Sequence, residues 1–79
     1  MPHVIIKLLP GRTEEQKLEI SKRITDVLVE VAITKPGNVS VAFEDVSGED
    51  WTEQVTIPFL HGKSETICKW PDHLLKKED

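Results

Sequence analysis

Two strand-like segments separated by one long helical segment constrain the fold of this chain more than any other feature. Residues 4–9 form a mostly apolar run rich in β-branched side chains, typical of a parallel strand whose faces are both largely buried. Residues 39–44 alternate with a period of two, which predicts a strand with Val39, Val41 and Phe43 on its apolar face. Since a helical crossover joins parallel strands, this order predicts a right-handed β-α-β unit.

The segment between the strands carries signals for both ends of a helix. Pro10-Gly11 ends the first strand as a turn. Thr13, followed by Gln16 three residues later, fits the capping box of a helix N-terminus. Lys35-Pro36-Gly37 is expected to stop the helix, which at about 20 residues is roughly 30 Å long. An apolar stripe with helical spacing consists of Ile20, Ile24, Val27, Leu28 and Val31.

The remainder of the chain has mixed signals. Ser47 or Asp50 is able to cap a short helix over residues 51–55. Pro58 is expected to interrupt the regular structure that follows this helix. Residues 61–70 show only a weak helical preference, and a charged tail closes the chain. We therefore expect an α/β (α+β) fold with two parallel strands, one long helix and a mixed C-terminal segment.

The small size of the chain makes self-association the expected route to stability. Its 79 residues allow a single domain over residues 1–79, and so few residues rarely build a sufficient core alone. Cys68 is the only cysteine, which excludes an internal disulfide framework. His3, His61 and His73 are scattered without zinc-type spacing, so no metal is expected. Two strands and one helix cannot cover both faces of a sheet, and a homo-oligomer is therefore predicted.

The charge balance argues against two classes of partner. With 14 acidic and 10 basic residues the formal net charge is −4, whereas non-specific nucleic-acid binding depends on clustered Lys and Arg. No nucleic-acid partner is therefore expected. The longest apolar runs fall far short of the roughly 20 residues that span a bilayer, and no signal-peptide pattern is present. We expect no membrane partner and a cytoplasmic location.

Three residues are the main candidates for chemistry, and His3 is a weaker one. Removal of Met1 leaves the nitrogen of Pro2 as a secondary amine, able to act as a base or a nucleophile, although a proline in second position often has no function. Arg12 stands beside the predicted helix N-terminus, where it either helps to bind an anion or is an ordinary solvated side chain. Trp51 is either a core residue or the wall of a pocket. His3 neighbours Pro2 and is either a structural residue or one that tunes the amine.

A family resemblance becomes visible when these residues are taken together with their surroundings. It rests on MPHVIIK at residues 1–7, PGRTEEQK at 10–17 and VSVAFEDV at 39–46, followed by Trp51. These segments resemble the 4-oxalocrotonate tautomerase family, and the longer tail is more similar to the dimeric, phenylpyruvate-tautomerase-like branch. The resemblance implies a β-α-β subunit, obligate oligomers and enol–keto tautomerisation of a 2-oxo acid without metal or organic cofactor.

The same resemblance implies roles for individual residues. Pro2 is then the general base, Arg12 binds the substrate carboxylate, and Trp51 makes the pocket apolar. Family members that act on dicarboxylates carry a second arginine where this chain has Ser40. That departure points to a monocarboxylate substrate such as a phenylpyruvate-type enol.

The distance between the candidate residues predicts a shared site. Pro2 begins the first strand and Arg12 follows its end, roughly 20 Å away at 3.3 Å per residue. Both can contact one small substrate only if they come from different chains, so a homo-oligomer is expected, with a dimer favoured and a hexamer possible. The alternative is a non-catalytic, oligomeric β-α-β module that binds a ligand or a protein.

Overall fold

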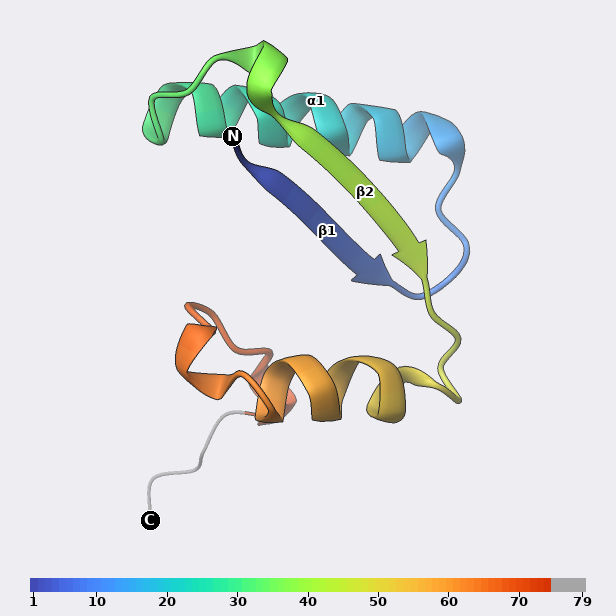
Figure 1. Ribbon diagram of the computed structural model, residues 1–79. Coiled ribbons are helices and arrows are strands. Elements are labelled where there is room, and N and C mark those ends of the chain that lie inside the picture. Colours follow the sequence, from blue (N-terminus) through green and yellow to red (C-terminus); the bar gives the residue numbers. More distant parts are fainter. Residues whose placement is uncertain (75–79) are drawn as a thin grey trace. The chain divides into compact units, whose positions relative to one another are not determined.

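The computed structural model describes residues 1–74, and the chain divides into two compact units (Figure 1). The first unit is Met1–Gly48 and contains both strands and the long helix. The second is Glu49–Asp79, of which residues 49–74 are described. The predicted charged tail lies outside the described residues.

The first unit is built on two parallel strands, as predicted. Strand β1 (His3–Leu8) pairs with strand β2 (Ser40–Asp45), and the register runs from His3 opposite Ser40 to Leu8 opposite Asp45. The ladder is extended at both ends, because the backbone N–H of Ser40 donates to Pro2 and that of Val46 donates to Leu8. The amino ends of both strands therefore lie together, and so do their carboxyl ends.

The two faces of this sheet have different neighbours. Val41 and Phe43 of β2 line a hollow with Leu18 of the long helix, so this face of the sheet lies against the helix. Since side chains alternate along a strand, the opposite face carries the remaining positions. We call this opposite side the open face; its residues are His3, Ile5, Lys7, Ser40, Ala42 and Glu44. Ile5, at its centre, is 52% exposed in the single chain.

Helix α1 (Glu14–Val31) begins as the sequence predicts. The side chain of Thr13 accepts the backbone N–H of Gln16 at 3.1 Å, and the side chain of Gln16 accepts that of Thr13 at 2.8 Å. These reciprocal bonds satisfy two of the donors that a helix N-terminus otherwise leaves unpaired. Glu14 and Glu15 lie in the first turn, where negative charge meets the positive end of the helix dipole.

The helix ends earlier than the sequence indicates. The last helical residue is Val31, and the backbone N–H of Ala32 closes the final turn on Leu28 at 3.0 Å. Ile33 then adopts a φ of 53°, a left-handed conformation that a β-branched residue rarely takes and that cannot continue the helix. Pro36 therefore does not end α1 but opens a short 3₁₀ turn before β2.

The second unit contains a helix that the sequence analysis did not foresee in this form. It is η2 (Thr52–His61), a helix with the wide π-type ladder, and Pro58 lies inside it. The prediction that Pro58 interrupts the regular structure is wrong, because the helix continues through it. In an α-helix the proline ring would clash with the carbonyl four residues earlier, whereas here the ladder closes between residues five apart, as in the 2.8 Å bond from Gly62 N–H to Ile57. Short 3₁₀ turns follow at Ser64–Thr66 and Asp72–Leu74.

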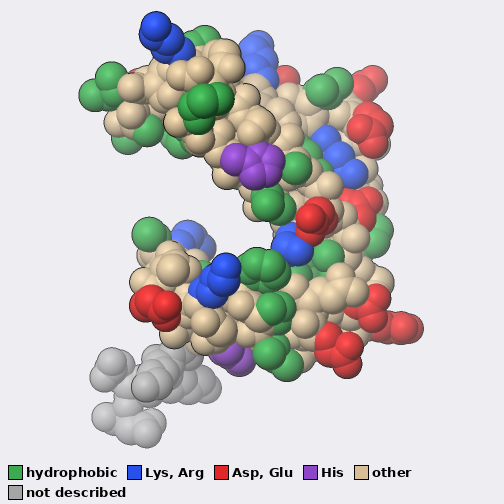
Figure 2. All heavy atoms as spheres, in the orientation of Figure 1, with side chains coloured by type: hydrophobic (Ala, Val, Ile, Leu, Met, Phe, Trp, Pro, Cys, Tyr) green, Lys and Arg blue, Asp and Glu red, His purple; other side chains and the backbone are tan. Residues whose placement is uncertain are grey.

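The core within a single chain is small. Among residues 1–74, Val46 at 4% and Val55 at 8% exposure are the buried apolar side chains. Figure 2 shows hydrophobic side chains lying among charged ones on the surface. The large apolar residues that remain exposed are Met1, Ile5, Leu9, Leu18, Val27, Val31, Ile33, Ile57 and Phe59. No helix in the described part of the chain is long and apolar enough to cross a membrane.

The capping box gives a prediction for stability. Replacement of Thr13 by Ala removes the acceptor for the Gln16 N–H, and we expect the free energy of unfolding to fall by about 1 kcal/mol. Chemical denaturation at fixed protein concentration measures the change. Lys22→Ala, an exposed helix position without a capping role, is the control and is expected to stay within about 0.5 kcal/mol of wild type. Equal losses for both variants would contradict a capping role.

Candidate functional site

Pro2 is held at the amino end of the sheet. It immediately precedes β1, its side chain is half-buried, and its carbonyl accepts the backbone N–H of Ser40 at 3.1 Å. Met1, by contrast, is 98% exposed. The residue that carries the candidate amine is thus fixed to β2, while the residue before it extends into solvent.

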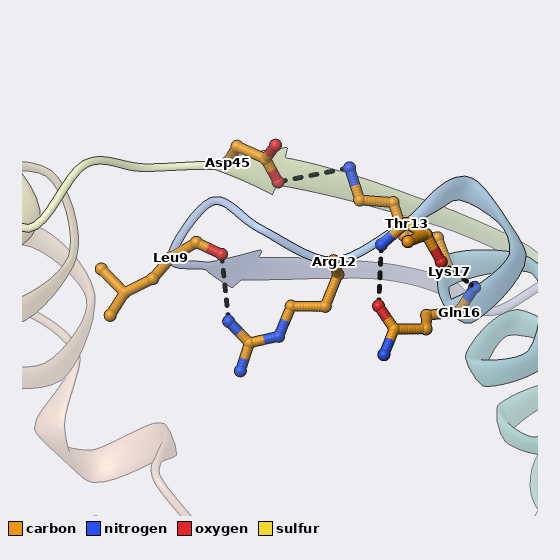
Figure 3. A network of polar contacts seen from close by, with 6 residues as sticks. All are labelled: Leu9, Arg12, Thr13, Gln16, Lys17 and Asp45. Carbon is orange, nitrogen blue, oxygen red and sulfur yellow. Dashed lines mark hydrogen bonds and ion pairs between the residues drawn. The ribbon is translucent and has the colours of Figure 1, made fainter.

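Arg12 lies beyond the other end of β1, in the turn that leads to α1. Gly11, with a φ of +124°, makes this turn possible because residues with a side chain are strained in that conformation. The guanidinium of Arg12 donates from Nη1 to the carbonyl of Leu9 at 3.2 Å (Figure 3). This bond directs the side chain back along the turn and gives it a neutral partner, so its positive charge is able to attract an anion.

The start of α1 is anchored beside this turn. Lys17, one turn into the helix, forms an ion pair with Asp45 at the end of β2, with 3.3 Å between Nζ and Oδ1 (Figure 3). Together with the capping box at Thr13, this pair fixes the helix N-terminus at the carboxyl end of the sheet. The turn that carries Arg12 therefore lies between two fixed segments, the paired end of β1 and the anchored start of α1.

An open hollow of about 350 Å³ lies between Arg12 and the first turns of α1. Its walls are formed by Arg12, Gln16, Glu19, Ile20 and Arg23. Glu19 accepts from Nε of Arg23 at 2.7 Å, and this hydrogen bond, together with the positive charge of Arg23, lowers the pKa of the Glu19 carboxyl. The hollow contains two guanidinium groups and one carboxylate, a balance that favours a single anionic group near Arg12.

Trp51 belongs to the second unit. It immediately precedes η2 with helical backbone angles, and its side chain is half-buried. Pro2 and Arg12 belong to the first unit, where β1 separates them. The single chain therefore does not unite Pro2 with Arg12, as the strand length predicts.

The open face carries two cross-strand polar pairs that the sequence analysis did not identify. Nδ1 of His3 and Oγ of Ser40 are 2.6 Å apart, which is a hydrogen bond at the amino end of the strands. Lys7 and Glu44 form an ion pair near the carboxyl end. Both pairs follow from the parallel register, but that register cannot be read from the sequence.

Arg23, which lines the hollow beside Arg12, is a further residue that the sequence analysis did not identify. Its spacing of four residues from Glu19 is the signal that indicates a helix ion pair.

A metal centre has no support within the described residues. There, no group of three or more His, Cys, Asp or Glu side chains is placed to hold a metal ion. Cys68 is a free, exposed thiol in the second unit. The candidate residues include a guanidinium that is able to attract an anion and, once Met1 is removed, a secondary amine that is able to take up a proton.

Comparison with known proteins shows similarity to tautomerases. Residues 2–58 match the family model for tautomerase enzymes. A "Probable tautomerase" from Xylella fastidiosa is 36% identical over 73 residues, which are 92% of this chain and 89% of the relative. A "2-hydroxymuconate tautomerase" from Comamonas testosteroni is 41% identical over 51 residues, or 65% of this chain and 81% of that protein. The crystal structure of DmpI from Helicobacter pylori is similar with a TM-score of 0.56 and 31% identity, covering 58% of this chain and 78% of DmpI.

Proposed function

Because the chain belongs to the tautomerase enzyme family, we propose that it interconverts the enol and keto forms of a 2-oxo acid with Pro2 as the general base. The family assignment makes the chain an isomerase. The proposal concerns the base, the substrate and the arrangement of the site. The observation that carries it is the position of Pro2, half-buried at the start of β1 and bonded to Ser40 through its carbonyl.

The reaction moves one proton between oxygen and carbon. The free amine of Pro2 takes the proton from the enol hydroxyl, the carbonyl double bond forms, and the former double-bond carbon receives a proton from the prolinium. One base that returns its proton completes the cycle, so no metal or organic cofactor enters the proposal. An α-amino group has a reference pKa of about 7.7–8.0, and a general base works best near the ambient pH.

The surroundings proposed for Pro2 favour its neutral form. Desolvation by an apolar wall and a nearby guanidinium both disfavour a cation and lower the pKa of the amine. We assign the guanidinium to Arg12 and part of the apolar wall to Trp51. Arg12 also holds the substrate carboxylate and stabilises the enolate that develops during proton transfer.

Ser40 restricts the substrate in this proposal. It offers a hydroxyl at the position where a second guanidinium would hold another carboxylate, and that hydroxyl is already bonded to His3. A monocarboxylate such as the enol of phenylpyruvate therefore fits better than a dicarboxylate. The Comamonas relative is named for 2-hydroxymuconate, and that enol is the comparison substrate in the tests below.

We further propose that two chains build each site. Within one chain, the six residues of β1 separate Pro2 from Arg12. An antiparallel neighbour brings the carboxyl end of its own β1 to the amino end of this one, so that Pro2 meets the neighbour's Arg12. We assign Trp51 to the same site on the family resemblance. The open face, with Ile5 half exposed, and the small core supply the apolar surface that such an assembly would bury.

The state of the N-terminus tests the role of Pro2. Protein freed of Met1, as verified by intact mass, is expected to ketonise the enol of phenylpyruvate. A form that keeps Met1 is expected to be inactive, because the Pro2 nitrogen is then an amide, and Pro2→Ala retains a primary amine and some activity. Full activity with Met1 in place would eliminate Pro2 as the base. Binding without turnover of either enol by the Met1-free protein would favour a non-catalytic module.

Arg12→Ala tests the carboxylate site. Loss of a charge-assisted hydrogen bond costs about 1.5–3 kcal/mol, so we expect KM for the phenylpyruvate enol to rise at least about tenfold. Arg12→Lys keeps the charge without the planar fork and is expected to lie between wild type and Arg12→Ala. Lys22→Ala, which does not line the hollow, serves as the control. An unchanged kcat/KM in Arg12→Ala would remove Arg12 from the site.

Sedimentation equilibrium at micromolar concentration tests the shared site. We expect a homo-oligomer, with a dimer favoured over a hexamer. Ile5→Asp puts a charge at the centre of the open face and is expected to weaken assembly and activity together. Ile33→Asp is the matched control, since Ile33 is fully exposed in a left-handed conformation that Asp accepts more readily. An active monomer of 9.0 kDa would refute the shared site.

A further inference from the structure

Ser40 is bonded to Pro2 and to His3, the first two residues of the chain once Met1 is removed. Its backbone N–H donates to the carbonyl of Pro2 at 3.1 Å, and its hydroxyl is 2.6 Å from Nδ1 of His3. The first bond belongs to the regular ladder of the sheet. The second is specific to the side chains at positions 3 and 40, which lie opposite each other in the register.

We propose that Ser40 and His3 are positioning residues that hold the Pro2 amine in the direction proton transfer requires. The inference rests on the proposed function of Pro2 as the base. Ser40 thus does not bind substrate; it acts through His3 and through the backbone of Pro2.

A terminal base needs such support more than an internal one. Chain termini are poorly ordered unless they are tied down, and once Met1 is removed no residue precedes Pro2 to restrain it. The amine of Pro2 cannot also serve as a ladder donor, because it must carry and release the substrate proton. Its orientation therefore depends on its carbonyl and on the next residue along the chain, and Ser40 bonds to both.

The hydrogen bond between His3 and Ser40 is able to form whether His3 is neutral or protonated. Neutral His3 accepts the Ser40 hydroxyl proton at Nδ1 or donates an Nδ1 proton to Oγ, and protonated His3 donates as well. The other charged groups on the open face are Lys7 and Glu44, which pair with each other four positions farther along the strands. A hydrogen bond between His3 and Ser40 is thus chemically possible in either form of His3.

Steady-state kinetics on the Met1-free oligomer test the proposal with the phenylpyruvate enol as substrate. Ser40→Ala and His3→Ala are each expected to lower kcat about tenfold while KM changes less than about twofold, because a misdirected base slows proton transfer without weakening substrate binding. The double variant is expected to lose no more than either single variant, since the two residues act as one unit. Ser40→Thr and His3→Asn retain the hydrogen-bonding groups and are expected to recover most of the lost kcat.

Lys22→Ala is the control. Lys22 is an exposed residue of α1 that belongs neither to the open face nor to the hollow beside Arg12. We expect this variant to leave kcat within about twofold of wild type. Sedimentation and circular dichroism of every variant distinguish a loss of positioning from a loss of assembly or folding, and the conservative variants supply the kinetic comparison if an alanine variant fails to fold.

Several results would overturn the proposal. They are a kcat in Ser40→Ala and His3→Ala equal to that of Lys22→Ala, losses that multiply in the double variant, or no recovery in Ser40→Thr and His3→Asn. A wild-type protein that is inactive without Met1, or active with it, would instead refute Pro2 as the base. The wild-type measurement therefore separates failure of the proposed function from failure of the positioning role.

Discussion

Parallel pairing of β1 with β2 is the constraint on which the rest of the first unit depends. Two parallel strands require a long crossover, and α1 supplies it. The crossover leaves from the carboxyl end of β1, so the turn with Arg12 and the anchored start of α1 lie at one end of the sheet. The amino ends of both strands lie at the other end, where Pro2 meets Ser40. The pairing thus separates the candidate base from the candidate anion site.

The separation of Pro2 from Arg12 links the stability gained on assembly to the chemistry of the proposed site. The single chain buries few apolar side chains and leaves Ile5 half exposed on the open face. A neighbouring copy that covers this surface would gain hydrophobic stabilisation and also bring a second set of site residues within reach. In such an arrangement assembly is a condition for activity, because neither end of the sheet holds both the base and the cation.

In the site that we propose, one side chain at the amino end of the sheet affects both the charge of the substrate and the geometry of the base. A long cation at position 40 would offer a bidentate partner to a second carboxylate. The short hydroxyl of Ser40 stays close to the backbone and bonds to His3. The same position therefore removes a charge from the site that we propose and adds a restraint on the first residues of β1. In the site that we propose, the charge class of the substrate and the orientation of the base both depend on this residue.

Features that depend on neighbouring residues could be predicted from the sequence. The capping box of Thr13 and Gln16, the apolar alternation near Val41 and the β-α-β order are local patterns, and the parallel pairing follows from the helix between the strands. The family resemblance also rests on short segments, and it identified Pro2 and Arg12 as candidates. Their separation could be predicted as well, because a strand has a fixed rise per residue.

The sequence alone determined the order of the elements, the start of α1 and the candidate residues, because each follows from interactions within a few residues. Tertiary structure decided the bond between His3 and Ser40, which joins side chains 37 positions apart and exists only in the observed register. It also decided that α1 ends at Val31 and that Pro58 lies within η2. Propensity describes what a residue prefers on average, whereas the register of a sheet and the ladder of a helix are chosen by the free energy of the whole unit.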